Sequence, residues 1–141
     1  MNPSGADLQR FVEAQAPVYA EVCAELAAGR KTSHWMWFIF PQLKGLGRSG
    51  TARYYGIESR DEALAYWQHP VLGPRLKQCA QLVLNTAAKT AYDIFGTPDE
   101  LKLRSCMTLF ADVATGDAVF NQVLERFWQG QPDQRTMALL R

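Results

Sequence analysis

Residues 97–116 read TPDELKLRSCMTLFADVATG, and this stretch decides the fold. Thr97, Pro98 and Glu100 form a capping-box pattern with proline at the first helical position, which is typical of a helix start. The apolar residues that follow recur at helical spacing: Leu101, Leu103, Cys106, Leu109, Phe110 and Val113. The pattern predicts one long helix that ends near Ala114.

The same spacing predicts helices on both sides of this segment. Downstream, one helix covers residues 117–129 and a short one follows Pro132. Upstream, the predicted helices are a short one from Asp7, one over residues 17–28 closed by Gly29, one over residues 63–68 opened by a capping box at Ser59, and one from Val71 or Pro74 to about Ala88.

The run HWMWFIF at residues 34–40 suits either a buried strand or a short buried helix. A helix is favoured, because a lone strand would have no partner for its backbone hydrogen bonds. We therefore expect an all-α, single-domain multihelical bundle over residues 1–141, with residues 1–6 disordered.

The composition favours a cytoplasmic protein that does not enter a membrane. The N-terminus lacks the features of a secretory signal, and the longest apolar run, residues 35–40, is far shorter than the roughly 20 residues of a membrane-spanning helix. Cys23, Cys79 and Cys106 are odd in number and widely spaced, so they are expected to be reduced core thiols. No metal or cofactor is expected, because the two histidines lack ligand spacing.

The charge is unevenly distributed, although the net charge is only +1. Residues 30–60 hold six basic residues and one acidic residue, whereas both flanking segments are net acidic. A local basic segment in a neutral protein favours an anionic ligand at one place over a general nucleic-acid coat. We therefore expect a small anionic ligand rather than a nucleic acid, and nucleic-acid binding stays as a third, less favoured alternative.

A glycine-rich motif lies inside this basic segment. Residues 45–50, GLGRSG, match the dinucleotide fingerprint G-x-G-x-x-G, but no second strand with an acidic residue follows, as a Rossmann unit requires. A phosphate or carboxylate cradle is the narrower interpretation. In it, Ser49 caps the following helix, and the cations are Lys44, Arg48 and Arg53. A tight loop with solvated basic side chains is an alternative of equal weight.

His34 lies beside Trp35 and Trp37 in the most aromatic segment of the chain, where an imidazole could act as a general acid or base. The alternative is a partly buried histidine with satisfied hydrogen bonds. Clustered tryptophans fill a core more often than they stack on a ligand.

Asp99, Lys102 and Ser105 recur every three residues along the long helix and form a polar strip. The strip could face a pocket. It could equally consist of a surface ion pair beside a hydroxyl that bonds back to the helix carbonyls.

The chain resembles the bacterial domain-of-unknown-function family 1810, which is sometimes labelled calpastatin. The resemblance rests on KTSHWMWFIFPQL at residues 31–43, on SCMTLF at residues 105–110, and on shorter matches elsewhere. It implies an all-helical fold, as in a mycobacterial relative, and it implies no activity. The polar signature positions of the family are Lys31, His34, Gln42, Ser49, Asp99, Lys102, Ser105 and Thr108.

These patterns lead to one functional hypothesis, a small phosphorylated or carboxylated ligand bound between residues 31–53 and 99–108. The candidate ligand-binding residues are Lys31, Trp35, Trp37, Gln42, Arg48, Ser49, Arg53, Lys102 and Ser105. An alternative is a hydrolase or transferase with His34 as general acid or base and Asp99 as its orienter. A helical protein-interaction or oligomerisation module without catalysis is the rival interpretation. The sequence leaves open whether the protein is an enzyme and what its oligomeric state is.

Overall fold

Ten α-helices and one 3-10 helix make up the regular structure of the described residues. The computed structural model describes residues 3–88 and 90–140, with side chains from residue 8 onward. The elements are α1 (Pro3–Gln15), α2 (Tyr19–Ala28), α3 (Met36–Ile39), η1 (Lys44–Leu46), α4 (Gly50–Tyr54), α5 (Arg60–Gln68), α6 (Leu72–Asn85), α7 (Ala91–Phe95), α8 (Asp99–Val113), α9 (Val119–Trp128) and α10 (Gln134–Leu140). No strand occurs in this described part, which confirms the predicted all-α fold.

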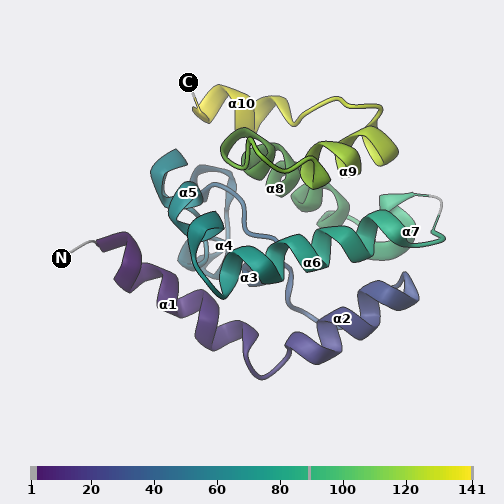
Figure 1. Ribbon diagram of the computed structural model, residues 1–141, viewed down its shortest axis with the longest axis horizontal. Helices are drawn as coiled ribbons and strands as arrows, with labels where there is room; N and C mark the ends of the chain where they lie inside the picture. The colour runs from purple at the N-terminus through teal and green to yellow at the C-terminus, as the bar shows by residue number, and fades with distance from the viewer. Residues whose placement is uncertain (1–2, 89, 141) are drawn as a thin grey trace.

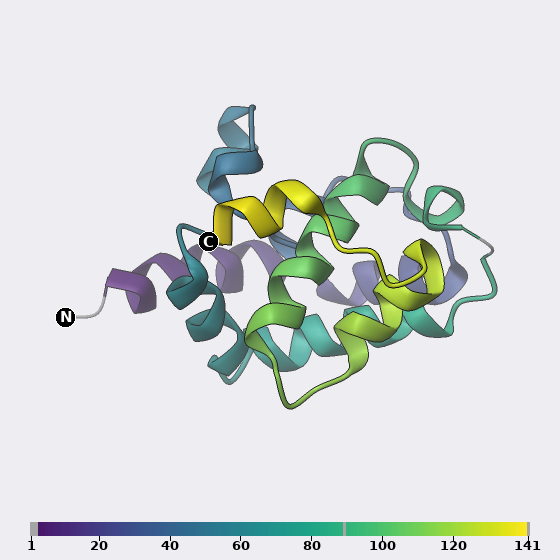
Figure 2. The same cartoon turned by 90° about the horizontal axis from the view of Figure 1, so that it is seen from above.

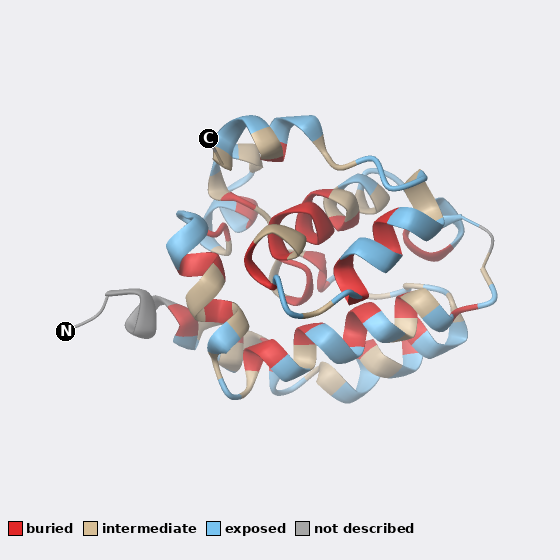
Figure 3. Cartoon of the chain, turned by 45° about the horizontal axis from the view of Figure 1, so that its top comes forward, coloured by how far each residue is buried: buried red, intermediate tan, exposed pale blue. Residues whose placement is uncertain are grey.

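The helices pack around α8, which contacts α5, α7, α9 and α10 (Figures 1 and 2). The long helix α6 contacts α2, α5 and α9, and α1 contacts α3 and α5. In Figure 1, α1 and α2 follow one edge of the molecule and α10 lies at the opposite edge, on α8 and η1. Buried residues gather on the faces that the helices turn toward one another (Figure 3).

The central position of α8 follows from a helix that is apolar over most of its circumference. Its buried residues are Leu103, Ser105, Cys106, Met107, Thr108, Leu109, Phe110 and Val113. The two buried hydroxyls donate hydrogen bonds to the carbonyls of Leu101 and Arg104, at 3.2 and 2.8 Å, so neither is left unpaired.

Leu101 departs from the predicted apolar face of α8, because its side chain is 53% exposed. Positions 101 and 103 lie about 200° apart around a helix of 3.6 residues per turn, so they cannot share one face. The side of α8 that carries Leu101 is nevertheless buried farther along, at Ser105 and Thr108. Leu101 is exposed in the first turn of the helix.

The caps at Ser59 and Gly29 lie where they were predicted, although α5 begins at Arg60 rather than at residue 63. The Ser59 capping box is only half formed, because the Glu62 carboxylate accepts the Glu58 N–H. Ser59 accepts a hydrogen bond from the Glu62 backbone N–H at 3.2 Å and caps α5. Gly29 ends α2 in the left-handed conformation, with φ of 75°. Residues 34–40 contain the short helix α3, as favoured over a strand.

The predicted capping box at Thr97 is wrong. The backbone N–H of Glu100, which the Thr97 hydroxyl was expected to bind, donates instead to the carbonyl of Gly96 at 3.0 Å. Pro98 then stands in the N-cap position without a side-chain hydrogen bond, and α8 begins at Asp99. The donor was already satisfied by the backbone, so the hydroxyl had no role there.

The N-terminal helix α1 begins at Pro3, ahead of the start expected at Asp7. Residues 3–6, which were expected to be disordered, belong to α1, and residues 1 and 2 lie outside the described residues. Among the residues that the structure covers, none of the helices combines the length and apolar character needed to cross a membrane.

Candidate functional site

A hollow of about 280 Å³ opens between η1, the N-terminal half of α8 and α10. Its lining residues are Gln42, Leu46, Pro98, Leu101, Lys102, Ser105, Asp133 and Arg135. We call it the α8–α10 hollow. Parts of both segments that were expected to enclose a ligand face each other here, and α10 adds a third wall.

Lys102 is the central cation of the α8–α10 hollow. Its Nζ lies 3.6 Å from Oδ1 of Asp99 and 5.4 Å from the centre of the Trp37 ring. The other oxygen of Asp99 pairs more closely with Lys31, at 3.0 Å, and the Lys31 side chain is only 7% exposed. One carboxylate is therefore shared by two ammonium groups, and the charge of Lys102 is only partly compensated.

The α10 wall brings a second cation and a carboxylate that is already in use. Asp133 caps α10, because its Oδ2 accepts hydrogen bonds from the backbone N–H and the hydroxyl of Thr136 at 2.9 and 2.6 Å. Within residues 8–88 and 90–140, no hydrogen bond or ion pair joins the exposed Arg135 to another side chain. With Lys31, Lys102 and Asp99 included, the surroundings of the hollow carry a net charge of +1.

Two neutral polar side chains complete the lining. Ser105 is buried, and its hydroxyl donates a hydrogen bond to the Leu101 carbonyl oxygen, with 3.2 Å between the two oxygens. Gln42 is half-buried, and its amide is the neutral group best able to donate hydrogen bonds into the hollow. The predicted grouping of Gln42, Lys102 and Ser105 is thus present in space.

Trp35 is not a wall of the hollow, although the sequence suggested one. It is buried, and its indole N–H donates to Oε1 of Glu25 at 3.0 Å. Glu25 also accepts the backbone N–H groups of Thr32 and Ser33 and the hydroxyl of Ser33. Burial by itself would raise the pKa of Glu25, but these four donors outweigh it and hold the pKa at about 2. Trp35 and Glu25 thus shape the turn that carries Lys31.

His34 does not meet Asp99 as the enzymatic interpretation required. The imidazole is exposed, while the carboxylate of Asp99 is occupied by Lys31 and Lys102. Within the described part of the chain, no hydrogen bond or ion pair links His34 to Asp99 or to Lys102. An acid–base role for His34 therefore has no oriented partner here.

The glycine-rich segment does not form the expected cradle in one place. Ser49 caps α4 by accepting the Ala52 N–H at 3.1 Å, as predicted for it. Arg48 is exposed and is not part of the α8–α10 hollow. Arg53 lines a different hollow of about 230 Å³, together with Arg10, Lys44, Tyr54, Gly56 and Glu58. The three residues are therefore separate from Lys102.

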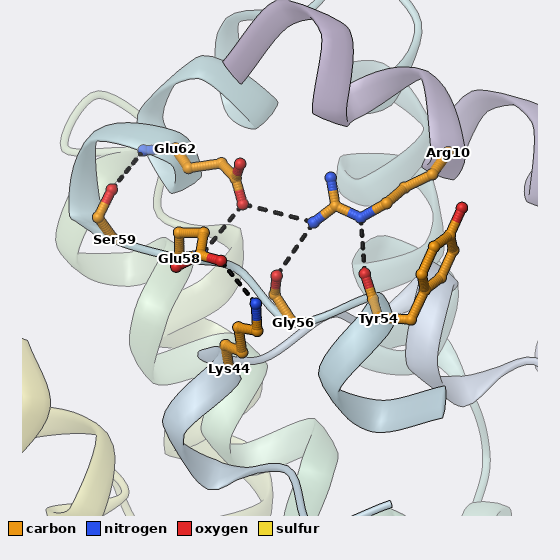
Figure 4. Close-up of polar contacts among 7 residues, drawn as sticks. All are labelled: Arg10, Lys44, Tyr54, Gly56, Glu58, Ser59 and Glu62. Atoms are coloured by element: carbon orange, nitrogen blue, oxygen red, sulfur yellow. Dashed lines mark hydrogen bonds and ion pairs between the residues drawn. The ribbon is translucent and has the colours of Figure 1, made fainter. Parts of the chain in front are cut away.

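That second hollow contains a charge cluster whose members pair with one another (Figure 4). Arg10 donates to the carbonyls of Tyr54 and Gly56 at 2.8 and 3.0 Å and lies 3.5 Å from Oε1 of Glu62, whose side chain is 3% exposed.

On the opposite side of the cluster, Lys44 pairs with Glu58 at 2.7 Å. The hydrogen bond from Lys44 lowers the pKa of Glu58. Both ion pairs are closed within the cluster, which suits a structural tie, and the exposed Arg53 takes part in neither pair.

Cys79 and Cys106 are buried, as expected of core thiols, whereas Cys23 is only half-buried. Burial raises the pKa of the Cys79 thiol to about 12 and that of Cys106 well above its usual range, so neither supplies a thiolate at neutral pH. No group of three or more His, Cys, Asp or Glu side chains in this part of the chain is placed to hold a metal ion.

The sequence interpretation missed Arg135, Asp133 and Leu46. The restart after Pro132 predicted a helix there, but nothing in the local pattern says that this helix lies across α8. The only local signal is Asp133 three residues before Thr136, a capping pattern that fixes the helix start and not its packing.

Comparison with known proteins shows where similar chains occur. A family model described as "Protein of unknown function (DUF1810)" matches residues 5–140. The chain is also similar to the conserved hypothetical protein Rv1873 from Mycobacterium tuberculosis, known from a crystal structure. The two are 54% identical with a TM-score of 0.93, and the match covers 95% of this chain and 96% of that one. A search of curated proteins finds no match.

Proposed function

Because the chain belongs to the DUF1810 family, whose description assigns no activity, we propose from its own geometry that it binds a small anionic ligand in the α8–α10 hollow. The observation that carries this proposal is the charge balance around Lys102 and Arg135. Asp99 is divided between two lysines, and Asp133 is engaged by Thr136. An anion would find two cations whose charge the protein does not fully compensate.

The size of the hollow limits the ligand. About 280 Å³ lies just below the range of roughly 300 to 1,000 Å³ that is typical of sites for drug-sized molecules. A single organic acid or phosphate ester fits this volume, whereas a whole dinucleotide would extend far outside it. Gln42 supplies a neutral hydrogen-bond donor, and the Trp37 ring makes a cation–π contact with Lys102.

We propose binding without a catalytic step. Among the described side chains, no carboxylate forms a hydrogen bond or ion pair with His34, and Asp99 pairs with Lys31 and Lys102. We also propose a cytoplasmic location, which the three free cysteines support, because a reducing compartment keeps thiols unpaired.

The test is a thermal-shift screen of organic acids and phosphate esters, followed by calorimetric titration of any compound that raises the melting temperature. Arg135→Gln removes one cation of the hollow and should weaken binding about tenfold or more, the usual effect of losing a charge-assisted hydrogen bond. Lys102→Gln should act in the same direction.

Arg48→Gln is the matched control, because it removes another exposed arginine that lies outside the hollow. Its affinity should stay within about twofold of the wild type at equal salt. If no acid or ester shifts the melting temperature, or if Arg48→Gln weakens binding as much as Arg135→Gln, the proposed site is wrong.

A further inference from the structure

The α8–α10 hollow is lined by both polar and apolar side chains. Gln42, Lys102 and Arg135 are polar members of the lining, and Leu46, Pro98 and Leu101 are apolar members. The two characters meet on α8 itself, where Leu101 and Lys102 are neighbours in the chain. A ligand that uses the whole hollow must therefore carry one charged end and one hydrocarbon part.

Leu101 is the residue that most clearly offers an apolar surface to a ligand in the hollow. It is one of the few large hydrophobic side chains that stay exposed, at 53%, although it belongs to the central helix. Fully burying a leucine contributes about 1.5 to 3 kcal/mol. A ligand that covers this side chain would gain part of that energy without any rearrangement of α8.

The charge of the hollow favours a monoanion. The net charge of +1 is the balance of two carboxylates, Asp99 and Asp133, and three cations, which are Lys31, Lys102 and Arg135. A carboxylate matches this charge, and an arginine fork binds its two oxygens side by side. A phosphate monoester carries nearly two charges at neutral pH, and it would bring the second one close to Asp133.

We infer that the ligand class is a monocarboxylic acid with an apolar body. Its carboxylate lies between Arg135 and Lys102, and its body covers Leu101 and Leu46. This inference rests on the proposed function and narrows it, because binding of an anion alone would need no apolar wall.

The experiment is a calorimetric titration with acetate, butanoate, hexanoate and hexyl phosphate at one ionic strength. Each added methylene that is buried should tighten binding by about fourfold, the fold-change that corresponds to roughly 0.8 kcal/mol. Hexanoate should bind more tightly than hexyl phosphate. Leu101→Ser should weaken hexanoate about tenfold and leave acetate unchanged, since acetate does not reach the leucine.

Leu139→Ser is the matched control. Leu139 is 51% exposed, also lies beside η1, and lines a different hollow. Its substitution should leave the hexanoate affinity unchanged. Because Leu101 is exposed, Leu101→Ser is expected to fold, and its circular dichroism and melting temperature will establish that it does.

The outcomes separate the two proposals. Binding that is lost in Arg135→Gln but is independent of chain length, or that is tighter for the phosphate, overturns the monocarboxylate inference and leaves the anion site standing. If none of the anions binds, the proposed function itself is overturned.

Discussion

Glu25 shows how much of the local geometry depends on a single side chain. This buried carboxylate accepts hydrogen bonds from Thr32, Ser33 and Trp35, and thereby holds the turn that leads from α2 to α3. Lys31 stands on that turn and reaches Asp99 on α8. Glu25 therefore helps to position the Lys31–Asp99 ion pair next to the proposed site.

The depressed pKa of Glu25 makes a prediction about stability and pH. Its folded pKa of about 2 lies below the ordinary value of 4.5, so its ionisation stabilises the fold above pH 4.5, and this contribution is lost as the pH falls from 4.5 toward 2. Glu25→Gln should lower the free energy of unfolding by about 2 to 4 kcal/mol at pH 7. Urea unfolding across the pH range measures this.

The difference between wild type and Glu25→Gln should shrink as the pH approaches 2. Glu13→Gln is the control, because Glu13 is exposed on α1, and it should change the free energy of unfolding by less than about 0.5 kcal/mol. A gap for Glu25→Gln that is equally large at both ends of the pH range would contradict the role given to its charge.

At the scale of elements, α5 and α6 approach each other closely at the corner between them. Gly73 lies in the first turn of α6, and a Cβ there would lie 2.1 Å from the carbonyl oxygen of Trp67. Backbone atoms cannot retreat as a flexible side chain can. The corner therefore needs a glycine at this position.

Gly73→Ala should destabilise the protein by about 1 to 3 kcal/mol, the range for overpacking, although alanine is the better helix former. Gly50→Ala in the first turn of α4 is its counterpart, because a Cβ there meets nothing within 4 Å. That variant should be neutral or up to about 1 kcal/mol more stable. Thermal unfolding of the two variants measures both stability changes. If Gly73→Ala and Gly50→Ala change the stability equally, the steric argument is wrong.

Helix positions were predictable where neighbours in the chain determine them. Ser59 capped α5 and Gly29 closed α2 because both act on groups within a few residues. Thr97 failed because the carbonyl of Gly96 took the donor, which depends on the path of the chain before the helix. The short helix α7 was missed, although Thr90 and Asp93 form a complete capping box at its start.

At the scale of the whole molecule, Arg10 ties α1 to the chain between α4 and α5. Its guanidinium binds two backbone carbonyls and the buried Glu62, which also accepts the N–H of Glu58. Removing one member of a buried ion pair leaves the other charge uncompensated, and this costs more than removing both.

A double-mutant cycle tests this tie. Arg10→Met should destabilise the protein by about 3 kcal/mol, while Arg10→Met combined with Glu62→Gln should lose less than the sum of the single variants, with a coupling of about 1 kcal/mol or more. Glu62→Gln keeps an oxygen for the Glu58 N–H. Additive effects in urea unfolding would show that the two side chains act independently.

The candidate site was predictable only in part. The pairing of Lys31 with Asp99 and the grouping of Gln42, Lys102 and Ser105 join segments far apart in the chain, and the polar signature of the family pointed to all five. Arg135 and Leu46 could not be found, because the placement of α10 across α8 depends on packing that no local pattern encodes. Trp35 and Trp37 look alike in the sequence, and only the buried Glu25 assigns Trp35 to the core.

The half-exposed Leu101 affects how well inorganic anions in the cell compete with an organic acid for the α8–α10 hollow. Chloride and inorganic phosphate outnumber most metabolites and are drawn to the same ammonium and guanidinium groups. Neither has a hydrocarbon part to lay against Leu101, so the gain from covering that side chain is open only to organic acids. Selectivity over the background of simple ions would then arise from the least polar contact in the hollow, and it should persist at salt concentrations that weaken purely ionic binding.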